Sequence, residues 1–168
     1  KTTLKGQQIF VLFSLFCIIV LTNCNLFQPS PYATCGSNTN YQENLTQLSR
    51  LNQLLFGDTI RFAVTGDSHL HYDELAMFVN KINSISSIEF VIHTGDITDN
   101  GIYSEYCKSF ETLRSLKCPI FVIPGNHDCL TMGMDLFNEF YGSSNFCFWI
   151  HHIKFVFFNN NFLEMGIK

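Results

Sequence analysis

Three short segments of the sequence combine glycine with carboxylate, imidazole and amide side chains. They are GDSH at residues 66–69, GDITDNG at residues 95–101 and GNHD at residues 125–128. Oxygen and nitrogen donors of these types suit Mn, Fe, Zn or similar borderline ions, and they do not suit a thiolate or Cu(I) site. A carboxylate among them could bridge two ions. The candidate ligands and catalytic groups are Asp67, His69, Asp96, Asp99, Asn126, His127 and Asp128.

The chemistry that such a set supports is hydrolysis of a phosphate ester. In two-metal sites the ions lie roughly 3.5–4 Å apart, clamp the phosphoryl oxygens and lower the pKa of a bound water toward about 7, so that hydroxide attacks in line. A nearby histidine can protonate the leaving oxygen. Asp67, Asp96 and Asn126 could instead serve only as turn or capping residues, which Asp and Asn favour. Three such segments in one chain favour the metal site.

Each segment follows a short apolar run. The runs lie within residues 59–71, 87–101 and 118–128, and each ends at a glycine. Such runs predict strands that are buried on both faces. Apolar residues at helical spacing separate the strands and predict two helices. The first helix has Leu75, Phe78 or Val79, and Ile82; the second has Tyr103, Tyr106, Cys107, Phe110 and Leu113.

The predicted order is therefore β-α-β-α-β, which implies an α/β fold with right-handed crossovers and a mainly parallel sheet. The polar segments then lie at the carboxyl ends of the strands, where open α/β sheets bind ligands. Further on, residues 134–142 predict another helix. Residues 145–161 predict two strands joined around His151 and His152, and this hairpin could begin a second, antiparallel sheet.

In this order, and each after a strand, GDSH, GDITDNG and GNHD resemble the calcineurin-like metallophosphoesterase family over residues 59–161. The resemblance implies mixed sheets flanked by helices and a dinuclear centre of divalent or trivalent ions of the Mn, Fe or Zn class. It also implies a small phosphate mono- or diester as substrate. The implied roles are metal ligation by Asp67, His69, Asp96 as the bridge, and Asn126; catalysis by His127 as general acid or phosphate contact, oriented by Asp99; and loop support by Asp128.

One departure from the family concerns its later histidines. The family supplies further ligands from a lone histidine and then a Gly-His-x-His segment, and the sequence contains no such segment. We therefore expect residues 58–168 to form the N-terminal half of a metallophosphoesterase domain, with an incomplete second metal site and weak or no activity. The alternative is a non-catalytic, lipid-anchored remnant that binds at most one ion.

The N-terminal segment predicts an export signal. Lys1 and Lys5 precede an apolar run over residues 9–21, which is short for a membrane span. The tetrapeptide LTNC, ending at Cys24, resembles a bacterial lipobox and predicts a lipid-anchored protein that faces the periplasm or the cell exterior. A plain signal peptide or short anchor with an incidental cysteine is the alternative. Residues 25–57 predict a tether and a short amphipathic helix with Leu48, Leu51 or Leu55, and Leu54.

Composition limits the remaining classes. Hydrophobic residues make up 46% of the 168 residues, which is enough apolar surface for a real core. The net charge of -4 with only 10 Lys and Arg gives no basic surface for nucleic acid, so a nuclease is not expected. His93, on the second predicted strand, is expected to be a hydrogen-bonded packing residue. His71 could either approach substrate or be solvated.

Overall fold

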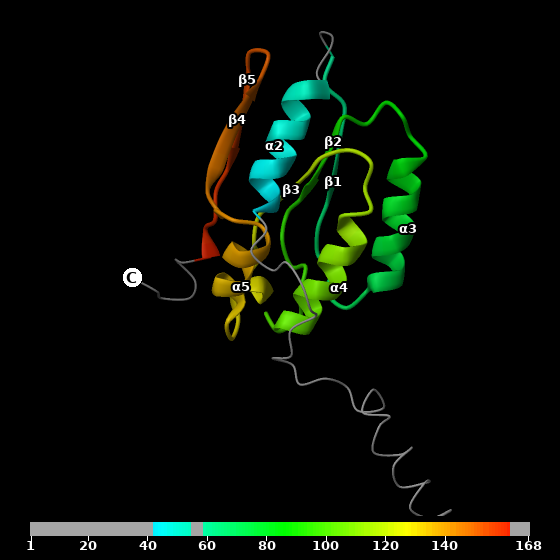
Figure 1. Ribbon diagram of the computed structural model, residues 1–168. Helices are drawn as coiled ribbons and strands as arrows, with labels where there is room; N and C mark the ends of the chain where they lie inside the picture. The colour runs from blue at the N-terminus through cyan, green and yellow to red at the C-terminus, as the bar shows by residue number, and fades with distance from the viewer. Residues whose placement is uncertain (1–41, 55–58, 162–168) are drawn as a thin grey trace, which may run out of the picture. The chain divides into compact units, whose positions relative to one another are not determined.

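A computed structural model describes residues 42–54 and 59–161 of the chain (Figure 1). The predicted signal segment 1–24 with Cys24, and residues 25–41 of the predicted tether, lie outside the described residues. Within the described ranges, no helix is long and apolar enough to cross a membrane. The elements are α2 (Glu43–Leu54), β1 (Phe62–Thr65), α3 (Tyr72–Asn83), β2 (Phe90–His93), α4 (Tyr103–Leu113), β3 (Ile120–Val122), η2 (His127–Cys129), α5 (Gly133–Phe140), β4 (Phe146–Ile150) and β5 (Ile153–Phe157).

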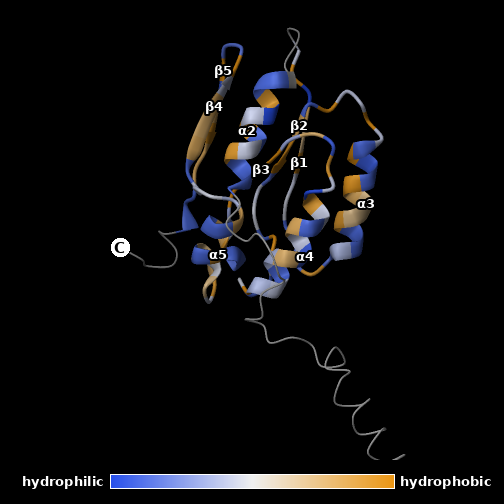
Figure 2. Ribbon diagram, viewed as in Figure 1, coloured by the Kyte–Doolittle hydropathy of each residue, from blue (hydrophilic) through white to orange (hydrophobic). Residues whose placement is uncertain are grey.

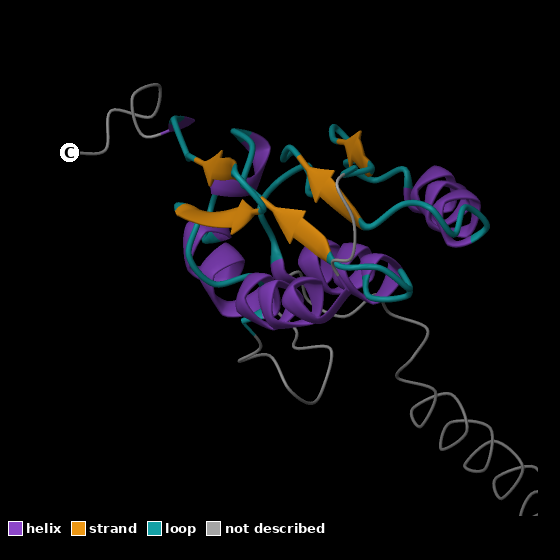
Figure 3. Ribbon diagram, turned by 90° about the horizontal axis from the view of Figure 1, so that it is seen from above, coloured by secondary structure: helices purple, strands orange, loops and turns teal. Residues whose placement is uncertain are grey.

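The central sheet has the predicted parallel arrangement. Its strand order is β1-β2-β3, and both neighbouring pairs are parallel, with Phe62 opposite Phe90 and Val91 opposite Ile120. Helices α3 and α4 connect the strands and lie next to each other (Figure 1). Seen from above, the strands form a layer with helices along it (Figure 3). The carboxyl ends of the three strands therefore share one rim, as the sequence predicts.

Apolar residues at helical spacing place the helices against the sheet. Helices α2, α3 and α4 each carry bands of hydrophilic and hydrophobic residues (Figure 2). In α3 the position left open in the sequence is settled in favour of Val79, which is 3% exposed, whereas Phe78 is only half-buried. All five apolar residues predicted for α4 are buried. These side chains form one core cluster with Val91, Ile120 and Val122 of the sheet.

A second core cluster fills the other side of the sheet and is rich in phenylalanine. Its buried members are Leu51, Phe90, Phe121, Phe148, Ile150 and Phe157. The last three belong to the antiparallel β4–β5 hairpin, whose turn lies at His151 and His152 as predicted. Leu51 belongs to α2 and is fully buried, as one of the two predicted alternatives requires, and Leu55 lies outside the described residues.

Helix α2 closes the outer edge of β3. The side-chain amide of Asn44 donates to the carbonyl oxygen of Val122 at 2.9 Å and accepts the Val122 N–H at 2.9 Å. A side chain thus supplies the two hydrogen bonds that another strand would make there. The amphipathic helix predicted at the domain edge is therefore present, while the predicted domain boundaries at residues 24 and 57 stay predictions.

One prediction about the strands is wrong. Residues of β2 and β3 are almost all buried, but Phe62 and Val64 of β1 are 41% and 55% exposed. Within the described residues β1 pairs with β2 only and forms an edge of the sheet. An apolar run therefore does not distinguish a central strand from an edge strand, because both need a hydrophobic face toward the core.

Candidate metal centre at the strand ends

Two backbone hydrogen bonds join the loop after β1 to the loop after β2. The Asp67 N–H donates to the Gly95 carbonyl at 2.9 Å, and the His69 N–H donates to the Asp96 carbonyl at 2.9 Å. Three of these residues have a left-handed backbone, with φ of 58° at Asp67, 41° at His69 and 51° at Asp96. This conformation is unfavourable for residues with a Cβ and tends to persist where the surrounding structure imposes it. Asp67, His69 and Asp96 therefore lie on strained backbone, and hydrogen bonds join the two loops that carry them.

The loops after β2 and β3 approach each other closely at their glycines. Gly95 has φ of 106°, and a Cβ added there would lie 2.2 Å from the Gly125 nitrogen. A Cβ on Gly125 would lie 2.1 Å from Oδ1 of Asp96. Only glycine allows this approach, which explains why the aspartate and the asparagine of the two motifs each follow a glycine.

Asp128 holds these two loops together from inside. Its carboxylate is fully buried and accepts hydrogen bonds from the N–H groups of Ile97, Thr98 and Gly125, and from the Thr98 hydroxyl, at 2.8 to 3.2 Å. Burial raises the pKa of Asp128, while the hydrogen bonds to Gly125 and Thr98 act in the opposite direction. This geometry agrees with a loop-supporting role for Asp128.

His69 lies between two acidic side chains. Its Nε2 is 2.7 Å from Oδ1 of Asp67, and its Nδ1 is 3.3 Å from Oδ1 of Asp99. The second contact lacks hydrogen-bond geometry, so Nδ1 is buried without a hydrogen-bond partner among the described residues. Donor atoms of Asp67, His69 and Asp96 lie within 4.8 Å of one another, and so do those of His69, Asp99 and His127. The rim thus gathers carboxylate oxygens and imidazole nitrogens around two small volumes.

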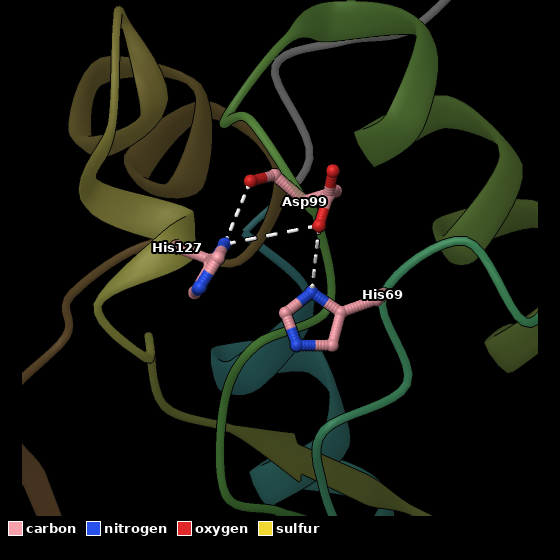
Figure 4. A group of neighbouring side chains, drawn as sticks. All are labelled: His69, Asp99 and His127. Atoms are coloured by element: carbon pink, nitrogen blue, oxygen red, sulfur yellow. Dashed lines mark hydrogen bonds and ion pairs between the residues drawn. The ribbon is translucent and has the colours of Figure 1, made fainter.

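His127 begins the short helix η2 and turns toward the loop after β2 (Figure 4). Its Nδ1 donates to the backbone carbonyl of Asp99 at 2.8 Å and is 3.9 Å from the Asp99 carboxylate. Its N–H donates to Oδ1 of Asp96 at 2.9 Å. The hydrogen bond to the Asp99 carbonyl is the main cause that raises the pKa of His127, and the charges of Asp96 and Asp99 add to it.

These contacts change one detail of the predicted arrangement. Asp99 was expected to orient His127, and the stronger contact comes from its backbone carbonyl, not from its carboxylate. The carboxylate instead turns toward His69. Asn126 is exposed one residue before His127, and His71 is exposed with Nδ1 3.9 Å from Glu74. The ligand and catalytic roles of Asp67, His69, Asp96, Asn126, Asp99 and His127 stay predictions.

Comparison with known proteins now gives the family. Residues 60–167, more than half of the chain, match the calcineurin-like phosphoesterase family. The chain belongs to that family. Its α/β architecture, with a parallel sheet and flanking helices, corresponds to the N-terminal half of a calcineurin-like fold.

Two curated proteins are similar to the chain over shorter stretches. The chain is 58% identical over 40 residues to a protein of Arcobacter nitrofigilis named as a probable glycerophosphodiester phosphodiesterase. That match covers 24% of this chain and 15% of the relative. The chain is 32% identical over 92 residues to a protein of Coxiella burnetii named as a probable cyclic nucleotide phosphodiesterase, covering 49% of this chain and 37% of the relative. The chain therefore spans well under half the length of either relative.

The residues at the rim of this member of the calcineurin-like phosphoesterase family fit a metal ion. Members of the family are typically metal-dependent. The orphaned Nδ1 of His69 has a lone pair or proton that lacks a partner, and the surrounding carboxylates supply negative charge. Buried polar atoms without a hydrogen-bond partner are rare in proteins, and a metal ion is one kind of partner that satisfies them. The mixed oxygen and nitrogen donors suit the borderline ions predicted from the sequence.

Sequence reasoning missed one residue that supports the rim, Glu105 on α4. It is 6% exposed, and its Oε2 accepts the N–H groups of Asp99 at 3.1 Å and Asn100 at 2.9 Å. Glu105 therefore fixes the turn that carries the Asp99 carbonyl. No signal in the sequence separates it from a solvent-exposed acid near a helix start, because its partners are backbone groups.

Proposed function

We propose that this chain carries part of the active site of a phosphoesterase that hydrolyses small phosphate esters with a dinuclear metal centre. The observation that supports this most is the meeting of Asp67, His69 and Asp96, from two strand ends, within 4.8 Å of one another. Asn126 is proposed as the ligand that the third strand supplies. Bound ions would polarise the phosphoryl oxygens and lower the pKa of a water so that it can attack phosphorus.

His127 is proposed as the proton donor to the leaving oxygen. Its Nδ1 already donates to the Asp99 carbonyl, so the second proton of the imidazolium stands on Nε2 and is the one available for transfer. The raised pKa of His127 increases the fraction of imidazolium at neutral pH. A general acid needs an oriented ring that carries a proton, and the contact with the Asp99 carbonyl favours both.

Among phosphate esters, diesters are the proposed substrate class. Both relatives described above are named as phosphodiesterases, of a glycerophosphodiester and of a cyclic nucleotide. A diester has one negative charge fewer to neutralise than a monoester dianion. A site with few cationic side chains therefore suits a diester, and the three segments at residues 66–69, 95–101 and 125–128 contain no Lys or Arg.

The proposal extends to location. We propose that the protein is exported and anchored by a lipid on Cys24, on the basis of the LTNC tetrapeptide after an apolar run. Expression in a bacterium, followed by detergent partition, tests this. The wild-type chain is expected in the membrane fraction, and Cys24→Ser is expected in the soluble exported fraction.

Metal titration combined with hydrolysis tests the catalytic proposal. The purified chain, and any longer polypeptide that its gene encodes, would be freed of metal and titrated with Mn²⁺. Hydrolysis of bis(p-nitrophenyl) phosphate and p-nitrophenyl phosphate would then be followed. We expect Mn²⁺-dependent cleavage of the diester in preference to the monoester. Absence of both Mn²⁺ binding and hydrolysis in every form would instead favour the non-catalytic remnant.

A further inference from the structure

His93 lies at the end of β2, beneath the loops that carry the proposed ligands. It is fully buried, and burial lowers its pKa to about 4. The imidazole is therefore neutral at neutral pH, and one ring nitrogen accepts while the other donates. His93 is three residues before Asp96 in the chain and is not a member of either donor group at the rim.

The neighbours of His93 decide which nitrogen carries the proton. The backbone N–H of Gly95 donates to Nδ1 at 3.2 Å, so Nδ1 must be the acceptor. The proton is then on Nε2, which is 3.1 Å from the hydroxyl oxygen of Ser68. His93 therefore donates to Ser68 and accepts from the backbone two residues ahead of it.

Ser68 stands between two proposed ligands. Asp67 and His69, on either side of it, both have left-handed backbones. Ser68 itself is only 9% exposed, whereas the Asp67 side chain is 81% exposed. The Ser68 hydroxyl thus faces the interior while the flanking residue faces the rim, and its hydrogen bond to His93 fixes which way this segment faces.

We propose that His93 is a positioning residue: through its Nε2–H bond to Ser68 it fixes the strained backbone that aims Asp67 and His69 at the metal centre. His93 belongs to neither donor group at the rim, and its ring is hydrogen-bonded to the Ser68 hydroxyl and to the Gly95 N–H. It complements the two backbone hydrogen bonds between the first and second loops, which it continues into the interior. Groups that orient metal ligands commonly change metal affinity roughly 10- to 100-fold when removed. This inference rests on the proposed function, because it assumes that Asp67 and His69 bind metal.

Two substitutions of His93 separate positioning from packing. In His93→Asn the side-chain oxygen stands where Nδ1 was and can accept from Gly95, but it cannot reach Ser68. In His93→Gln the side-chain nitrogen is as many bonds from Cα as Nε2 and can still donate to Ser68. Each variant loses one of the two hydrogen bonds and part of the ring, so both should lower the unfolding temperature of the metal-free chain.

The readout is Mn²⁺ affinity, measured with the metal alone by electron paramagnetic resonance of the free ion. We expect His93→Asn and Ser68→Ala each to raise the Kd for Mn²⁺ roughly 10-fold or more, and His93→Gln to stay near the wild-type value. The variant that combines His93→Asn with Ser68→Ala should have a Kd no higher than the higher of the two single-variant values, because both substitutions remove the same interaction. Ser144→Ala removes another buried serine hydroxyl, outside the three loops, and should leave the Kd unchanged.

Three results would overturn the inference. Equal Mn²⁺ affinity in His93→Asn, Ser68→Ala and the wild type would show that the link does not position the ligands. An equal loss in His93→Asn and His93→Gln, in proportion to their loss of thermal stability, would reduce His93 to a packing residue. If the wild type does not bind Mn²⁺ at all, the proposed function fails and the inference fails with it. An unchanged Kd in the variants, with Mn²⁺ still bound, would overturn the inference alone.

Discussion

The strand-end rim and the turn of the β4–β5 hairpin both place histidines beside a left-handed residue, yet they differ in everything that holds a side chain in place. At the rim, Asp67 and His69 are tied to the next loop by backbone hydrogen bonds. At the turn, His151 has φ of 51°, and His151 and His152 are both exposed. Their rings are 6.2 Å apart, and neither belongs to a group of metal-ligating side chains found in the described ranges.

The difference shows that residue type alone does not make a site. An exposed histidine at a turn can adopt many rotamers, so binding a metal ion there would cost side-chain conformational entropy. At the rim that entropy is already lost when the protein folds, because buried Asp128 and Glu105 hold the loops by hydrogen bonds to their backbone. The following changes break or sharpen this comparison, from the largest expected effect to the smallest.

Asp96→Asn should abolish Mn²⁺-dependent diester hydrolysis. Asp96 is the proposed bridge between ions, and its amide would lose the charge that holds them. Because Oδ1 of Asp96 also accepts the His127 N–H, the isosteric asparagine keeps an oxygen for that bond. Folding measured by circular dichroism should therefore be nearly unchanged while hydrolysis is lost. Wild-type turnover in this variant would remove Asp96 from the metal centre.

His127→Ala should lower kcat by roughly 100-fold or more while changing Mn²⁺ affinity much less. A proton donor of this kind contributes on the order of 10²- to 10⁴-fold to a rate. Steady-state kinetics on bis(p-nitrophenyl) phosphate, combined with Mn²⁺ titration, separates the two effects. Loss of the metal along with the activity would instead make His127 a ligand, together with its neighbour in the donor group, His69.

Asp128→Ala should destabilise the fold by on the order of 3 kcal/mol, because it leaves several buried N–H groups without an acceptor. The affected donors are the backbone of Ile97, Thr98 and Gly125 and the Thr98 hydroxyl. Urea unfolding of the metal-free chain measures this loss. A change below about 0.5 kcal/mol, the usual range of a surface substitution, would show that the hydrogen bonds to the Asp128 carboxylate do not hold the two loops together.

The stability of the chain should fall as the pH decreases from about 6.5 toward about 4, in part through His93. Its folded pKa of about 4 is lower than the ordinary histidine pKa of 6.5, so in this window the unfolded chain takes up a proton that the folded chain does not. The stabilisation is complete above pH 6.5 and is lost as the pH approaches the folded pKa; it amounts to about 3 kcal/mol. The difference in unfolding free energy between wild type and His93→Gln, measured along this pH range, should show the slope.

His151→Ala and His152→Ala should change neither Mn²⁺ affinity nor hydrolysis, and each should alter the unfolding free energy by less than about 0.5 kcal/mol. Both side chains are exposed at the hairpin turn. The paired alanine variant is the matched control for the rim substitutions, since it removes two imidazoles from a strand end. A weakened Mn²⁺ affinity in the pair would place the hairpin turn in the metal centre and erase the comparison.

Much of the fold was predictable because the repeated pattern is local. Apolar runs that end in glycine gave the strands β2 and β3, and helical spacing gave the buried faces of α3 and α4. The exposure of Phe62 and Val64 was not predictable, since edge and central strands use the same residue types. The edge pairing by Asn44 was also invisible, because an amide that replaces a strand lies 78 residues from its partner.

The sequence by itself determined the order of the elements, the rim at which the three motifs meet, and the donor types, since these follow from hydrophobic period, chain direction and side-chain chemistry. Only the tertiary structure decided which atoms face one another. It turned the Asp99 carbonyl toward His127 and the Asp99 carboxylate toward His69, and it joined His93 to Ser68. The physical reason is that hydrogen bonds act over about 3 Å between groups far apart in the chain, and no local pattern records them.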